Sequence, residues 1–148
     1  MTQSTSASGG GAFQPADDYN LTGQIDMVKA QVSSATGYLG YATGAGGIVT
    51  QITSKATAVT LSTMCGDITM NNAALSNGVV VSFTLTNTNI NATDLLVLNH
   101  ISGGTAGSYL LNAQCAAGSA SINVTNITGG SLSEAIVIRF AIFRCVKS

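Results

Sequence analysis

His100, the only histidine of the chain, is the first residue to test for chemistry, because histidine can act as a general base near neutral pH. It ends an apolar run (LLVLNH, 95–100), and the nearest acidic residue along the chain is Asp94. Catalysis would require the fold to place a nucleophile or a carboxylate beside the ring. We therefore expect His100 to be a hydrogen-bonded residue at the end of a strand.

The acidic residues could supply paired carboxylates for glycoside hydrolysis or oxygen ligands for calcium. Asp67, Asp94 and Glu134 each stand just before an apolar run, and Asp17 and Asp18 form the one adjacent pair. The sequence contains no D-x-D-x-D-G element, and neither Asp94 nor Glu134 has an evident carboxylate partner. The pattern favours acids that solvate turns and strand starts. We expect no catalytic residue, no metal and no cofactor.

The three cysteines, Cys65, Cys115 and Cys145, could form a disulfide, a zinc site or a reactive thiol. Their number is odd, they lie far apart, and none belongs to a C-x-x-C pair. Each sits in or beside an apolar segment, where a free cysteine behaves as a small hydrophobic residue. Buried free thiols are the first expectation, a disulfide the second and a catalytic thiol the third.

Charge is scarce in this chain. Its 148 residues include five Lys and Arg and six Asp and Glu, a charged fraction of 7% against about 25% in an average soluble domain. No basic run exists to bind a phosphate backbone, and no apolar run approaches the roughly 20 residues that span a bilayer. The start of the chain has neither the basic nor the apolar part of a signal peptide. We expect no nucleic-acid partner, no membrane contact and no export.

Polarity comes instead from 18 Thr, 16 Ser and 11 Asn, a composition typical of β-sheet proteins. Four of the asparagines begin N-x-T sequons, namely Asn20, Asn91, Asn123 and Asn126. Because the chain is so rich in Asn and Thr, we interpret these sequons as chance. We expect these residues to form cross-strand pairs in a sheet.

The N-terminal third differs from the rest of the chain. Residues 1–11 are mainly Ser, Thr and Gly and contain no apolar cluster, a composition that cannot repay the entropy of ordering by itself. The apolar residues between 21 and 32 follow a loose helical spacing, so this stretch is predicted to be either a short helix or an extended arm. Residues 37–47 hold five Gly and two Tyr, which indicates a linker. The sequence divides into an arm, 1–47, and a domain, 48–148.

From residue 48 onward, short β-rich runs alternate with turn residues. The predicted strands are 48–52, 58–61, 67–70, 79–86, 95–101, 108–114, 121–127 and 135–146. These runs predict an all-β, jelly-roll-like β-sandwich of about eight strands with an extended N-terminal arm. The last strand is apolar on both sides, which predicts a central or covered position. The residues expected in the core are Val81, Phe83, Leu85, Val97, Ile122, Val124, Ile138 and Phe140.

Glycine marks the expected turns. Ser76-Asn77-Gly78 is a strong turn signal because Asn and Gly tolerate positive φ. The stretches 101–104 and 127–130 share the order hydrophobic residue, hydroxyl residue, Gly, Gly. We expect these two stretches to form equivalent turns.

Residues 40–148 resemble a family of small structural proteins of tailed bacteriophages. The resemblance is most specific at 65–75 (CGDITMNNAAL) and 130–140 (GSLSEAIVIRF), and it extends to 92–107 (ATDLLVLNHISGGTAG). It implies a virion surface protein without catalytic residues. Two settings are implied, a capsid decoration or cement protein on the head and the receptor-binding tip of a tail fibre.

A fibre tip would normally follow a long shaft, whereas a short arm precedes the domain here, so we favour the cement protein. This setting implies the major capsid protein and further copies of the chain, as a homodimer or homotrimer, as partners. We expect Phe13, Tyr19, Leu21 and Ile25 to anchor the arm against the capsid or a sister subunit. The alternatives are an arm that folds back on its own domain, and a fibre tip whose loops at 102–107 and 128–133 bind a host-cell glycan.

Overall fold

The computed structural model describes residues 40–145. The predicted anchors Phe13, Tyr19, Leu21 and Ile25, and the predicted helix or arm around them, lie outside the described residues. The described part contains β-strands and turns and no helix, so no helix in it could cross a membrane. The all-β prediction is confirmed.

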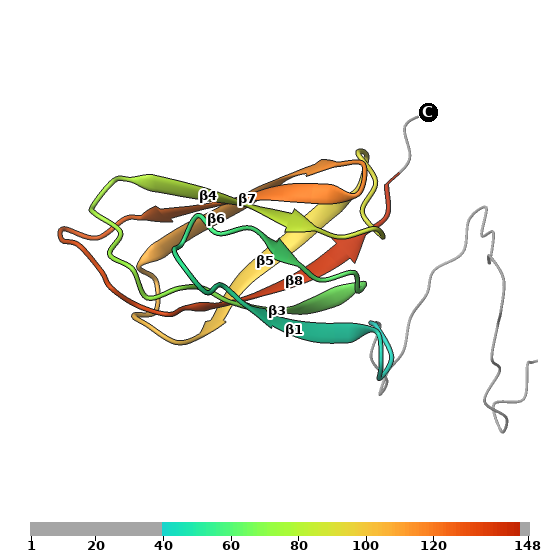
Figure 1. The fold of residues 1–148 in the computed structure, drawn as a ribbon, viewed down its shortest axis with the longest axis horizontal. Helices are drawn as coiled ribbons and strands as arrows, with labels where there is room; N and C mark the ends of the chain where they lie inside the picture. The colour runs from blue at the N-terminus through green and yellow to red at the C-terminus, as the bar shows by residue number, and fades with distance from the viewer. Residues whose placement is uncertain (1–39, 146–148) are drawn as a thin grey trace, which may run out of the picture. The chain divides into compact units, whose positions relative to one another are not determined.

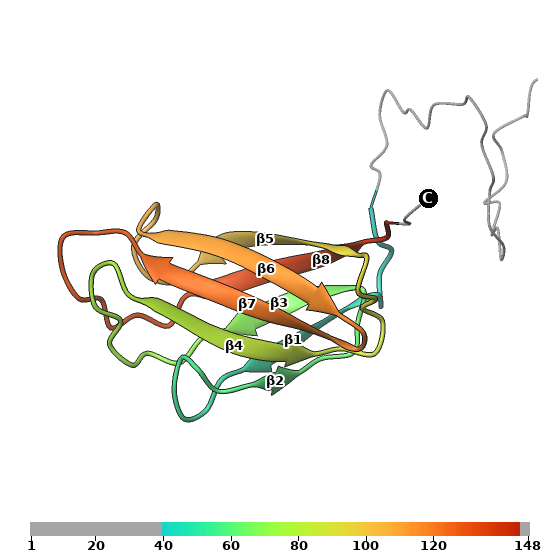
Figure 2. The ribbon, with the colours of Figure 1, turned by 90° about the horizontal axis from the view of Figure 1, so that it is seen from above.

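Each of the eight predicted runs overlaps one strand. The strands are β1 (Gly46–Thr50), β2 (Val59–Thr60), β3 (Cys65–Thr69), β4 (Val80–Thr86), β5 (Leu95–Ser102), β6 (Tyr109–Ala116), β7 (Ser119–Asn126) and β8 (Val137–Phe143). They form two four-stranded sheets, which face each other as the layers of a sandwich (Figures 1 and 2). Sheet A has the order β1-β3-β8-β5 and sheet B the order β2-β4-β7-β6.

The two sheets are built alike. In each sheet, one edge strand pairs in parallel with its neighbour, β1 with β3 in sheet A and β2 with β4 in sheet B. All other neighbouring strands pair antiparallel. β8 lies between β3 and β5, so the prediction of a central last strand is confirmed. The edge strands β5 and β6 follow each other in the chain and lie on the same side of the sandwich (Figure 2).

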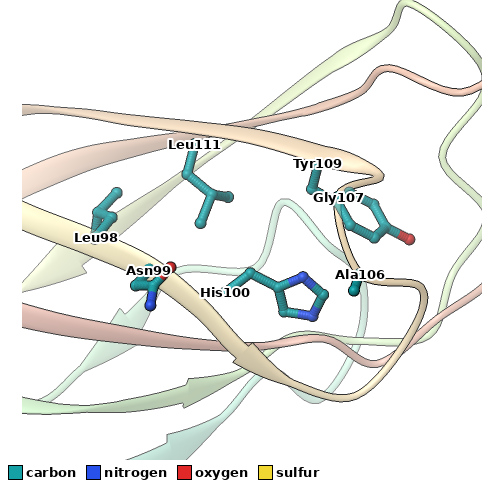
Figure 3. A pocket seen from close by; sticks show the side chains of 7 residues that line it. All are labelled: Leu98, Asn99, His100, Ala106, Gly107, Tyr109 and Leu111. Carbon is teal, nitrogen blue, oxygen red and sulfur yellow. The ribbon is translucent and has the colours of Figure 1, made fainter.

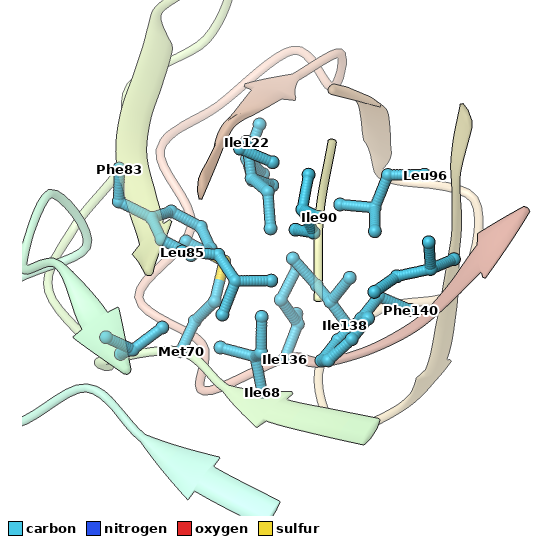
Figure 4. Packing of buried hydrophobic residues seen from close by; sticks show 14 of the residues in the cluster. Ile68, Met70, Phe83, Leu85, Ile90, Leu96, Ile122, Ile136, Ile138 and Phe140 are labelled. Atoms are coloured by element: carbon cyan, nitrogen blue, oxygen red, sulfur yellow. The ribbon is translucent and has the colours of Figure 1, made fainter. Parts of the chain in front are cut away.

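The core lies between the sheets, where inward-facing side chains from both layers meet (Figure 4). Along β4 and β8 every second residue is buried, as expected for strands with one face in the core. Six of the eight predicted core residues are buried: Phe83, Leu85, Ile122, Val124, Ile138 and Phe140. Val81 is half-buried and packs against the same cluster.

The prediction for Val97 is wrong, because this side chain points away from the core and is half exposed. Leu95, Leu96, Val97 and Leu98 are consecutive apolar residues, so this run has no alternation that could reveal its inward face. The structure turns Leu96 inward, and Leu98 packs against the core.

The glycine turns are confirmed in one case and corrected in the other. Gly78 has a φ of +70°, and the Val79 amide donates to the Ser76 carbonyl, which closes the predicted turn. The turn does not form a hairpin, because β4 pairs with β2 and β7 and the preceding Leu75 bridges to Leu132. Gly103 and Gly104 also have positive φ, whereas Gly129 and Gly130 do not. The turns at 101–104 and 127–130 are therefore not equivalent, although their sequences follow the same order.

Candidate functional site

The outer face of sheet A carries an apolar patch next to the end where β8 finishes. The patch consists of four exposed side chains from β5, β8 and the segment before β1, with one partly buried alanine between them, namely Tyr41, Leu95, Val97, Phe143 and Ala141. Phe143 exposes 64% of its surface, Leu95 56% and Val97 51%. Register places Leu95 beside Phe143 and Val97 beside Ala141 on neighbouring strands. Tyr41, Val97, Ala141 and Phe143 also line a hollow of about 350 Å³.

An ion pair crosses the same face beside the patch. Arg139 on β8 donates to Asp67 on β3 through Nε and Nη2, at 2.7 and 2.8 Å, in a bidentate arrangement. The Arg139 guanidinium holds the pKa of Asp67 below its ordinary value. Asp67 was expected to solvate the start of a strand; it lies inside β3 instead, where β8 supplies its partner.

The outer face of sheet B is polar and carries no charged residue on its strands. Its outward positions come from β4, β7 and β6 and are mainly hydroxyl and amide side chains. A row of hydrogen bonds crosses it, since Ser82 Oγ donates to Asn123 Oδ1 and Asn123 Nδ2 donates to Asn112 Oδ1, both at 2.6 Å. For Asn123 the expected cross-strand pairing is confirmed.

The histidine lies in a small cluster at the end of the sandwich where the β5–β6 and β7–β8 connections meet (Figure 3). His100 Nε2 lies 3.0 Å from the Ser102 carbonyl oxygen and also faces that of Gly103, so this nitrogen carries the proton. The imidazole meets the Tyr109 ring edge to face, with ring centres 5.8 Å apart. The prediction of a hydrogen-bonded residue at the end of a strand is confirmed.

Glu134 joins this cluster from the β7–β8 connection. The Tyr109 hydroxyl donates to Glu134 Oε2 at 2.7 Å, and the Thr105 hydroxyl donates to Oε1 at 2.6 Å. Hydrogen bonds from Thr105 and Tyr109 lower the pKa of Glu134, and burial raises the pKa of Tyr109 further above neutrality. Neither group can exchange a proton easily near pH 7, so the pair is better suited to holding two loops together than to acid–base catalysis.

A pocket of about 320 Å³ opens beside this cluster and is lined by Leu98, His100, Tyr109, Leu111 and neighbouring backbone. No sequence pattern predicts that Tyr109, Thr105 and Glu134 meet, because Glu134 lies on a separate segment and the three residues belong to no motif.

The remaining charged side chains of the described part also have structural partners. Lys55 is buried and donates through Nζ to the carbonyl oxygens of Asn71 and Glu134, which ties three loops together. Burial lowers the pKa of Lys55. Arg144 Nε lies 3.1 Å from Asp94 Oδ1 as an ion pair, although the angle is unsuitable for a hydrogen bond, and the Asn91 amide donates to Oδ2. Asp94 is buried, contrary to the expected solvent-exposed role.

Cys65, Cys115 and Cys145 are free, as expected first, but they are half-buried instead of buried. Burial raises the pKa of the Cys115 thiol, which makes it a weak nucleophile. Within residues 40–145, no group of three or more His, Cys, Asp or Glu side chains could hold a metal ion.

Comparisons with protein-family models, with curated proteins and with solved structures found no match to this chain.

Proposed function

We propose that this chain is a non-enzymatic structural protein of a virion, a capsid decoration or cement protein that binds and stabilises the outer surface of a tailed-phage head. The resemblance of residues 40–148 to small phage structural proteins suggests the setting. The apolar patch on the outer face of sheet A is the observation that carries the proposal. Contiguous apolar surface of this kind is rare on a protein that stays alone in water, and it marks an interaction site.

The charged residues support a structural role. The six in the described part are three cations and three anions, and each one has a partner inside the fold. Because these charges balance within residues 40–145, that part of the chain can pack against further copies without long-range repulsion. Its ionisable groups stabilise loops and sheets, and none of them forms a nucleophile–base pair on the described surface.

The proposed mechanism is mass action on the assembled shell. A protein that binds the closed shell better than its separated subunits stabilises the shell, and many weak contacts repeated over a lattice act together. Phe13, Tyr19, Leu21 and Ile25 remain the proposed anchors toward the major capsid protein. The sandwich is then the part displayed on the head.

Two measurements on purified particles test this proposal. A cement protein is present at hundreds of copies per particle, so quantitative mass spectrometry against the major capsid protein should find a comparable amount. Shells that carry the protein should also resist heating to a higher temperature than shells without it. A few copies per particle, or equal disruption temperatures, would contradict the proposal.

One observation favours the fibre-tip alternative. The β5–β6 and β7–β8 connections, which include the predicted loops at 102–107 and 128–133, lie at one end of the domain, and the described chain begins and ends at the other (Figures 1 and 2). Thr105 and Glu134 join these two connections. A tip would present such loops to a cell-surface glycan, and its low copy number would distinguish it from a cement protein.

A further inference from the structure

The outer face of sheet A has two neighbouring rows of residues, one that combines small residues with an exposed valine and one that contains the ion pair. Across β1, β3, β8 and β5, one row holds Gly46, Cys65, Ala141 and Val97, and the next holds Ile48, Asp67, Arg139 and Asn99. The first row therefore has small residues in its first three positions and an exposed valine in its last. The second row has an acid and a base in its two central positions, on adjacent strands.

We propose that a second copy of this chain packs its sheet A against sheet A of the first. The two-fold axis that relates the copies lies in the plane between the two faces, and it runs midway between β3 and β8 and nearly parallel to them. This axis places β3 of one copy opposite β8 of the other, and β1 opposite β5. It keeps each residue in its row. Asp67 of each copy then faces Arg139 of the other, and the two internal ion pairs become a square of four alternating charges.

The same axis matches the shapes of the two copies. Val97 of one copy faces Gly46 of the other, and Cys65 faces Ala141. Gly46, Cys65, Asp67 and Arg139 line a hollow of about 330 Å³ on this face, so the projecting valine meets an opening instead of another large side chain. Two faces that place large residues opposite small ones can approach to the roughly 10 Å at which sheets pack.

The outer face of sheet B offers no such complementarity, because its strands carry neither an acid nor a base. The four strands of sheet A have 5, 5, 7 and 8 residues. At about 4.8 Å between strands and about 3.4 Å per residue, they give a footprint of roughly 19 Å by about 17 to 27 Å. This area is at the small end of specific interfaces, so we expect a dimer that dissociates on dilution.

This inference deepens the proposed function, because it names the surface through which copies of the chain associate. It rests on the proposed function only in that a cement protein is expected to form such oligomers. It does not depend on the capsid, because the dimer is expected in the isolated full-length chain. Shell binding and copy number test the capsid assignment separately, so either idea can fail without the other.

The test uses two charge-reversal variants in analytical ultracentrifugation. Asp67→Arg gives a face with two cations, and Arg139→Asp gives one with two anions. Each variant alone places like charges opposite each other in the dimer, and its dissociation constant should rise at least about 30-fold. An equimolar mixture places two cations of one copy opposite two anions of the other and should form a heterodimer nearly as tight as the wild-type dimer.

Gln114→Arg, on the outer face of sheet B, is the matched control and should leave dimerisation unchanged. Val97→Arg tests the same face without touching the ion pair and should give a monomer. Circular dichroism confirms that each variant is folded. A monomeric or trimeric wild-type chain, a dimer that survives Asp67→Arg and Val97→Arg, or a mixture that stays monomeric would overturn the proposal.

Discussion

The outer faces of sheets A and B cover the same core but present different chemistry to solvent. Sheet A shows an apolar patch beside one bidentate ion pair. Sheet B shows mainly hydroxyl and amide side chains, one row of which is joined by hydrogen bonds, with Val80 and Leu110 exposed on either side of Thr125. The hydroxyl and amide groups of sheet B form hydrogen bonds with water and with one another. The apolar patch of sheet A gains free energy only when another surface covers it and removes it from water. Because of this difference, we propose sheet A rather than sheet B as the contact between copies.

The inner faces of the two sheets should contribute similarly to stability, because both pack into one core. The difference between the sheets should then concern only their outer faces. Phe140→Ala in sheet A and Phe83→Ala in sheet B each remove a buried ring from the common cluster. We expect either substitution to lower the free energy of unfolding by about 3–5 kcal/mol, measured by urea denaturation. Thr84→Ala, on the outer face of sheet B, is the control and should change it by less than about 0.5 kcal/mol. A large loss for one ring alone would show that the sheets do not share one core.

Asn126 and Asn123 lie on opposite faces of β7, so replacing each one compares the stability contribution of a buried asparagine with that of an outer one. Asn126 is buried, donates to the carbonyl oxygens of Leu75 and Gly130, and accepts from the Thr128 amide. Asn126→Ala removes these buried hydrogen bonds and leaves the Thr128 amide without its partner, so it should cost about 1–3 kcal/mol in thermal unfolding. Asn123→Ala breaks exposed hydrogen bonds that water can replace, so its cost should be clearly smaller. Equal costs would contradict this account of sheet B.

Much of this fold could be predicted from residue patterns, because alternation reveals the inward face of a strand. This reasoning succeeds for Phe83 and Leu85 in β4 and fails for Val97, whose neighbours are all apolar. Pairings between distant segments leave no such local signal. Asp67 and Arg139 lie 72 residues apart, and their ion pair follows only from the register of β3 with β8. The candidate face could not be foreseen for the same reason.

Matched apolar substitutions sharpen the comparison of the two faces. Val97 in sheet A and Leu110 in sheet B are about equally exposed. Val97→Thr should weaken dimerisation by roughly tenfold, which corresponds to about 1.4 kcal/mol. Leu110→Thr should leave the dissociation constant unchanged. Sedimentation at a series of concentrations measures both, and an equal effect of the two substitutions would argue against a contact confined to sheet A.

The smallest expected effect concerns the acid side of the pH profile. The folded-state pKa of Asp67 is below its ordinary value of 3.8, so its ion pair contributes stability above that value and loses it as the pH falls through the folded-state pKa. Wild type should therefore lose slightly more stability than Asp67→Asn on acidification below about pH 4. Denaturation at a concentration that keeps the chain monomeric measures this difference. Parallel profiles would show that the ion pair is not formed in the single copy.

Hydroxyl-radical footprinting of the full chain at increasing protein concentration tests the central claim most directly. Leu95, Val97 and Phe143 on sheet A can be compared with Val80 and Leu110 on sheet B, which are 55% and 56% exposed. The account predicts that oxidation of the three sheet A residues falls as the dimer forms, while oxidation of the two sheet B residues stays constant. Unchanged oxidation on sheet A at every concentration, or protection on sheet B instead, would contradict it.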